Sequence, residues 1–212
     1  MQPRGNVNHP HRHAAVRLSR PSTTLCAFLT LLNDRLGESI VFPLLPFLLA
    51  SYTSNGRTLG LLAGSYAVAQ FAFTPLIGAL SDRYGRRPVM AGCVAGSVLG
   101  LGLFALTVSI QWQAIPWAAG TALPLALLFA ARLIDGVSGG TAATAGAVLA
   151  DISTPENRAK AFGLIGVAFG LGFILGPFFG GVLARINVTL PVWAAAGFAL
   201  VNLLLVLLLL PE

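Results

Sequence analysis

Two long apolar runs separated by a short basic turn most constrain how this chain can fold. Residues 58–80 and residues 88–110 contain no Asp, Glu, Lys or Arg. Each run supplies the about 20 apolar residues that a helix needs to cross the hydrocarbon core of a bilayer. The turn between them, Gly78–Met90, is polar and carries Asp82 and three arginines. So tight a connection predicts two antiparallel, neighbouring membrane helices.

The composition of the whole chain agrees with that class. Of 212 residues, 56% are hydrophobic and only 9% are charged, and the mean hydropathy is +0.80. Soluble domains carry about 25% charged residues. The apolar runs are too long for barrel strands and lack their alternation. We therefore expect an all-α membrane protein whose surroundings are a lipid bilayer.

Six apolar segments are long enough to span the membrane, so the chain is expected to form a six-transmembrane-helix bundle. A basic arm, residues 1–23, precedes them, and its His9, His11 and His13 could bind a metal. No Cys or acid joins these histidines, so we expect neither a metal site nor a cofactor. The expected spans are residues 24–50, 58–80, 88–110, 124–149, 159–184 and 188–210.

The distribution of cations predicts the orientation of the bundle. The arm, the Gly78–Met90 turn and the loop with Arg158 and Lys160 together hold nine Lys and Arg residues, whereas the opposite loops hold only Arg57 and Arg185. Cytoplasmic loops carry the excess of Lys and Arg. Both termini and the turn are thus expected in the cytoplasm. This pattern also explains the net charge of +6 without nucleic acid as a partner.

Two of the predicted spans contain charges. Asp34, Arg35 and Glu38 lie in the first span, and Arg132 and Asp135 lie in the fourth. Such groups are costly in a bilayer and need partners or water. One interpretation is internal ion pairing that only holds the two spans together. The other is a polar path for protons or a charged substrate, which the extra acid of the first span favours. These carboxylates could equally serve a sodium ion.

No enzyme is predicted. The chain has no GxxxxGK[ST] and no HExxH motif, and no Ser/His/Asp set lies at a membrane face.

Four stretches, in the expected order, resemble motifs of the major facilitator superfamily. The turn Gly78–Arg87 looks like the signature loop between helices two and three. Asp34–Pro46 looks like the first-helix motif of the drug:proton antiporter branch, which includes tetracycline efflux proteins. Arg132–Gly140 resembles the fourth-helix motif, and Gly172–Gly181 the antiporter motif of helix five. The resemblance covers about residues 24–210. It implies the N-terminal half, with 3+3 inverted repeats, of a twelve-span transporter whose C-terminal half is absent here.

The resemblance implies three groups of functional residues. Residues for proton coupling or cavity lining would be Asp34, Glu38, Arg132 and Asp135. A cytoplasmic latch would comprise Gly78, Asp82, Arg83, Gly85, Arg86 and Arg87. The antiporter motif, which distinguishes exporters from importers, would comprise Gly172, Gly176, Pro177, Gly180 and Gly181. Position 135 is acidic where the family often has glutamine, so the proton carrier stays open among Asp34, Glu38 and Asp135.

The implied function is secondary active transport: proton-coupled efflux of drug-like or other small amphipathic molecules across the plasma membrane, namely a bacterial inner membrane. The partners would be substrate, protons, and either the missing six-helix half or a second copy of this chain. An alternative is a non-transporting, truncated or half-size six-span membrane protein that acts as an assembly subunit. Because part of the latch's partner surface would lie beyond residue 212, we also expect Asp82 and Arg86 to be under-satisfied within the six helices.

Overall fold

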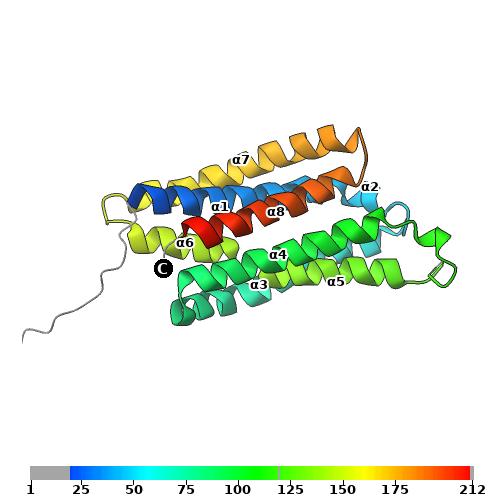
Figure 1. Ribbon diagram of the computed structural model, residues 1–212, viewed down its shortest axis with the longest axis horizontal. Helices are drawn as coiled ribbons and strands as arrows, with labels where there is room; N and C mark the ends of the chain where they lie inside the picture. The colour runs from blue at the N-terminus through cyan, green and yellow to red at the C-terminus, as the bar shows by residue number, and fades with distance from the viewer. Residues whose placement is uncertain (1–19, 119, 211–212) are drawn as a thin grey trace, which may run out of the picture.

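The computed structural model describes residues 20–118 and 120–210, which form a bundle of long helices (Figure 1). The basic arm and its histidines therefore lie almost wholly outside the described residues. No strand occurs among the described residues. The helices are α1 (Arg20–Val41), η1 (Phe42–Leu44), α2 (Leu45–Leu49), α3 (Gly56–Tyr84), α4 (Arg86–Ser109), η2 (Trp112–Ala114), α5 (Leu123–Ser138), α6 (Thr141–Ile152), α7 (Arg158–Ala184) and α8 (Leu190–Leu209).

Four of the six predicted spans are single helices, and two are broken. The first span is divided into α1, η1 and α2, where Pro43 and Pro46 remove backbone donors. The fourth is divided into α5 and α6 at Gly139 and Gly140. Within residues 20–118 and 120–210, five helical segments are long and apolar enough to cross a membrane, counting α5 and α6 as one. The first span is not among these five, and it is the span that carries Asp34, Arg35 and Glu38.

The packing of the helices relates the first three spans to the last three. Helix α1 packs against α7 and α8, while α5 packs against α3 and α4. If α1 is exchanged with α5, α3 with α7, and α4 with α8, the α1–α7 contact becomes the α5–α3 contact. The α1–α8 contact likewise becomes the α5–α4 contact. The remaining large contact, α4 with α8, maps onto itself. This arrangement is the one expected of two three-span repeats.

Glycines let the helices of these pairs approach closely. A Cβ at position 172 of α7 would lie 2.7 Å from the Cβ of Arg35 in α1, and one at position 180 would lie 2.9 Å from the carbonyl oxygen of Ile40. In the α4–α5 contact, a Cβ at Gly100 would lie 2.9 Å from the carbonyl oxygen of Ala131. Small residues of this kind allow helix association in lipid, where hydrophobic burial gives little drive.

The predicted turn between α3 and α4 lies at one end of the bundle (Figure 1). The start of α1, the α3–α4 turn, the α6–α7 turn and the end of α8 all lie at the same end of the bundle (Figure 1, left). Gly85 alone separates α3 from α4, with φ of +100°, a conformation that favours glycine. The antiparallel hairpin predicted from the two apolar runs is therefore present.

Candidate functional site

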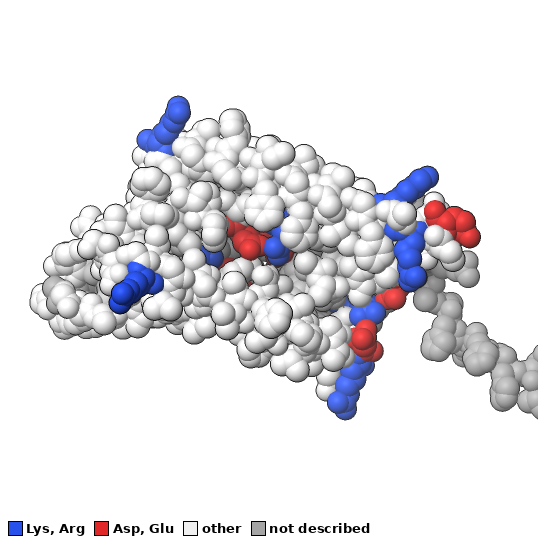
Figure 2. All heavy atoms as spheres, turned by 180° about the vertical axis from the view of Figure 1, so that it is seen from behind, with Lys and Arg blue, Asp and Glu red and all other residues white. Residues whose placement is uncertain are grey.

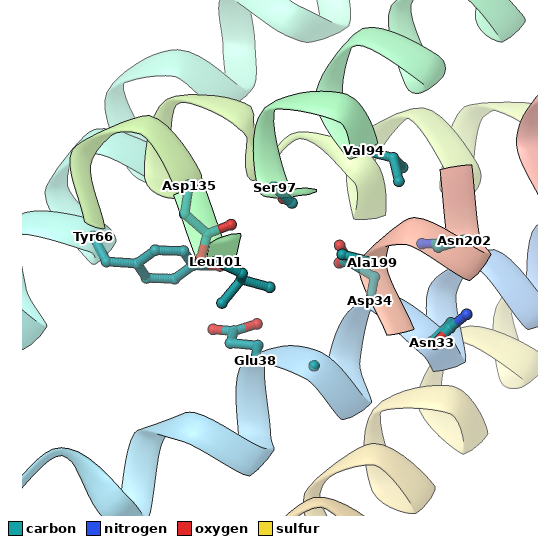
Figure 3. Close-up of a pocket in the computed structure, with 11 residues that line it drawn as sticks. Asn33, Asp34, Glu38, Tyr66, Val94, Ser97, Leu101, Asp135, Ala199 and Asn202 are labelled. Carbon is teal, nitrogen blue, oxygen red and sulfur yellow. The ribbon is translucent and has the colours of Figure 1, made fainter. Parts of the chain in front are cut away.

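A small polar cavity lies within the bundle. Its volume is about 20 Å³, and it is lined from α1, α3, α4, α5 and α8 (Figure 3). Its polar lining residues are Asn33, Asp34, Glu38, Tyr66, Ser97, Asp135 and Asn202. In the space-filling view of Figure 2, acidic and basic atoms are visible in an opening near the middle of an otherwise mostly uncharged face. The sequence-predicted carboxylates Asp34, Glu38 and Asp135 thus meet at one cavity.

Arg35 neutralises part of this charge from within α1. Its guanidinium donates to Asp34 Oδ2 from Nη2, at 2.6 Å, and from Nε, at 3.2 Å, and its Nη1 pairs with Glu38. The side chain is only 6% exposed. It also lies over the ring of Phe169 in α7, 4.9 Å from the centroid. One buried cation therefore serves two carboxylates, and this cluster keeps one negative charge in excess.

The charges of α5 form a second, looser pair. Arg132 Nη1 lies 3.8 Å from Asp135 Oδ2, one helical turn away. Arg132 is buried, and its Nε and Nη2 have no hydrogen-bond partner. Instead, the guanidinium lies over the rings of Phe104 and Tyr66, at 4.8 Å and 5.9 Å from their centroids. A guanidinium held by aromatic faces and one long ion pair can change partner more readily than one that is fully hydrogen-bonded.

These pairings decide one question that the sequence left open. The idea that ion pairs hold the first and fourth spans together is wrong for the described residues, because every ion pair among these five charges joins residues of one helix. Each pair joins residues one or three positions apart along a single helix. The two helices instead share the cavity.

Sequence reasoning missed several neutral residues of the site. Tyr66 in α3, Ser97 in α4, and Asn33 and Asn202 all line the cavity. Asn202 is 1% exposed, and its Nδ2 donates to the carbonyl oxygen of Thr30, at 3.1 Å. The available signal was that Asn202 is the only Asn, Gln, Ser or Thr between positions 190 and 209. An isolated amide in such an apolar span needs a polar partner in the bundle.

At the end of the bundle, Arg86 connects the α3–α4 turn to α6. Its Nη1 donates to Asp82 Oδ1, at 2.5 Å, and to Ser81 Oγ, at 2.7 Å. Its Nε donates to Asp151 Oδ2, at 3.0 Å. Arg86 was expected to be under-satisfied within these helices, but it donates to three side chains there, and this pairing counts against a latch that waits for a partner outside this chain. The Asp82 carboxylate, 68% exposed, also pairs with Arg86.

The other latch residues have separate places. Arg87 Nη2 donates to the carbonyl oxygen of Leu207 in the last turn of α8, at 2.7 Å. Arg83 lies over the ring of Tyr84, 5.3 Å from the centroid. Gly78 faces open space, and Gly85 forms the turn. The turn thus contacts both α6 and α8 of the second three-span unit.

The residues of the antiporter motif fall on two faces of α7. Gly172, Gly176 and Gly180 lie against α1, and Ser39 Oγ of α1 donates to the carbonyl oxygen of Gly172, at 2.6 Å. Pro177 and Gly181 lie on the exposed face. Close packing of α7 against α1 accounts for the three buried glycines. Packing within this chain does not account for Pro177 and Gly181.

A helical bundle with an apolar exterior and a charged interior cavity defines the class of the protein: a multi-pass membrane protein with a polar site inside the bundle. Residues 25–212 match the sequence profile of the Major Facilitator Superfamily. The chain belongs to this superfamily, whose members related to it are transporters and not enzymes.

The relatives include bacterial and animal proteins. The chain is 38% identical to the class C tetracycline resistance protein of Escherichia coli, over 83% of this chain and 41% of the relative. It is 33% identical to the human major facilitator superfamily domain-containing protein 10, over 87% of this chain and 43% of the relative. The crystal structure of that human protein, titled an organic anion transporter, superposes with a TM-score of 0.75 at 32% identity, over 92% of this chain and 49% of the other. The chain spans about half the length of the relatives it matches.

Proposed function

We propose that this chain forms the N-terminal half of a proton-coupled efflux transporter for small, drug-like or amphipathic molecules. The observation that carries the proposal is that Asp34, Glu38 and Asp135 line one cavity while only two buried guanidiniums, Arg35 and Arg132, accompany them. One carboxylate is therefore without a cation of its own. A carboxylate of this kind can take up a proton and release it when its neighbours rearrange.

The proposed mechanism rests on the long ion pair between Arg132 and Asp135, whose Nη1 and Oδ2 atoms are 3.8 Å apart. Protonation from outside would remove one negative charge from the cavity and change which carboxylate Arg132 faces. Each pairing would favour one of the two states, open to the inside or to the outside, and proton binding would shift the equilibrium between them. Arg86 and its bonds to Asp82 and Asp151 would stabilise one of these states at the cytoplasmic end.

The cavity itself constrains where substrate binds. A volume of about 20 Å³ holds one water molecule or ion, whereas pockets for drug-sized ligands measure about 300–1,000 Å³. The substrate would therefore lie between this six-helix unit and a second one, either the rest of a longer chain or a second copy. The excess of carboxylates disfavours an anionic substrate at the cavity.

The distribution of cations supports the orientation. The described basic residues at the end that holds the α3–α4 and α6–α7 turns are Arg20, Arg83, Arg86, Arg87, Arg158 and Lys160, against Arg57 and Arg185 in the opposite loops. This excess favours a cytoplasmic location for that end. The tetracycline resistance relatives are bacterial, and we infer a bacterial inner membrane.

Transport by the purified full-length protein in lipid vesicles tests the proposal. An imposed pH gradient is expected to drive substrate exchange, and Asp34→Asn, Glu38→Gln and Asp135→Asn are each expected to weaken it. Glu156→Gln, in the loop before α7, is the matched control and should leave exchange unchanged. Proton-driven exchange that survives neutralisation of all three intramembrane acids would sink the mechanism. Exchange driven only by the opposite gradient would indicate an importer.

A further inference from the structure

The cavity has two polar ends, and one of them is rich in oxygen atoms without partners. Figure 3 shows Asp135, Tyr66 and Glu38 on one side and Asp34, Asn33 and Asn202 on the other. The first side holds two of the three acids assigned to proton coupling, and the third, Asp34, lies on the second side (Figure 3). The second holds two side-chain amides, from α1 and α8, beside a single carboxylate.

The hydrogen bonds of Asn202 leave its oxygen atom free. Its Nδ2 donates to the carbonyl oxygen of Thr30, at 3.1 Å, which makes Oδ1 the remaining atom. This Oδ1 is buried and has no hydrogen-bond partner, and the same is true of Asn33 Oδ1. Buried oxygens are normally satisfied by a donor, water or a cation. Two unsatisfied amide oxygens, on residues that line the same cavity as Asp34, therefore point to a ligand that the protein itself does not supply.

The charge at this end calls for a cation. Both bonds that Asp34 receives from Arg35 end on Oδ2. Arg35 is shared with Glu38, so the two carboxylates have only one cation between them. No Lys or Arg is among the described residues that line the cavity. The position thus combines oxygen donors with a local charge of minus one.

We propose that Asp34, Asn33 and Asn202 bind a small monovalent cation, Na⁺. Oxygen ligands suit hard cations. A divalent ion would leave positive charge in the bilayer interior, and no group of three His, Cys, Asp or Glu suited to a metal occurs in the described part of the chain. A cavity of about 20 Å³ has room for one ion of this size. The ion balances the excess carboxylate of α1 and satisfies both amide oxygens.

Sodium binding is tested on the purified protein in lipid nanodiscs by thermal unfolding and by ²³Na NMR line broadening. Replacing choline chloride with NaCl at equal ionic strength is expected to raise the apparent unfolding temperature by about 3 °C. Asn202→Leu and Asp34→Asn should each abolish this shift and the line broadening. Thr141→Val is the control: it also removes a buried hydroxyl without a partner, but from α6, away from the cavity.

An equal unfolding temperature in the two salts, or a sodium response that persists in Asp34→Asn, would overturn the site. If Asn202→Leu does not fold, the Asp34→Asn variant and the ²³Na NMR titration are sufficient to test the sodium site. The measurement uses neither substrate nor a pH gradient. The site can therefore fail while proton-driven transport is observed, and it can be present in a protein that does not transport.

Discussion

The Nε atom of Arg86, in the first turn of α4, lies 3.0 Å from Oδ2 of Asp151 near the end of α6. The residues are 65 positions apart, and the bond joins the first three-span unit to the second. The α3–α4 turn was expected to wait for a partner outside the chain, but it already has one within it. We interpret the bond as an internal clasp whose opening would accompany any relative movement of the two units.

A double-mutant cycle over this pair measures its strength. Arg86→Ala and Asp151→Ala are expected to couple by only about 0.5 kcal/mol in the free energy of unfolding, because the Asp151 side chain is 57% exposed and water screens the charges. Transport, in contrast, should fall severalfold in either variant. Arg158→Ala, at the exposed start of α7, is the control for loss of a cation at the same end of the bundle. If transport is unchanged in Arg86→Ala, the α3–α4 turn has no role in the transport mechanism.

The buried cluster of α1 predicts a large effect at Arg35. Arg35→Met would leave Asp34 and Glu38 without a cation in the bilayer interior and should cost about 3 kcal/mol of stability. Arg57→Met, at the exposed start of α3, should change stability by at most about 0.5 kcal/mol. Denaturant unfolding in detergent compares the two.

The same cluster allows an internal check of that explanation. Adding Asp34→Asn and Glu38→Gln to Arg35→Met removes the unpaired charges and should recover much of the lost stability. If the triple variant were less stable than Arg35→Met, lost packing against Phe169, and not unpaired charge, would explain the effect.

The two faces of α7 predict opposite responses to the same substitution. Gly172→Ala should destabilise the protein by about 1–3 kcal/mol, because the new methyl group would meet the Cβ of Arg35 at 2.7 Å. Gly181→Ala points into open space and should be neutral or slightly stabilising, since Ala favours a helix over Gly. Thermal unfolding in detergent measures both, and equal losses would contradict the α1–α7 contact described above.

The opposite end of the bundle is stabilised by a buried tryptophan. Trp112 donates from Nε1 to the carbonyl oxygen of Thr107, at 2.9 Å, and is 7% exposed. Trp112→Phe should cost about 1–2 kcal/mol through the lost bond and the space left behind. Trp117→Phe, at 71% exposure, is the matched control and should have little effect on the unfolding temperature. A larger loss at Trp117 would show that the loop packs differently.

The sequence by itself determined the helices, the hairpin at Gly85 and the spans that carry charge. A chain in lipid must satisfy its backbone within helices and can keep charges only inside the bundle, so apolar runs and their interruptions are direct signals. Tertiary structure decided the rest. Arg86 pairs with Asp151 of another helix, and Asn33, Tyr66 and Asn202 line one cavity with the acids. Those contacts depend on the rotation and approach of separate helices, which side-chain packing fixes and local sequence spacing does not encode.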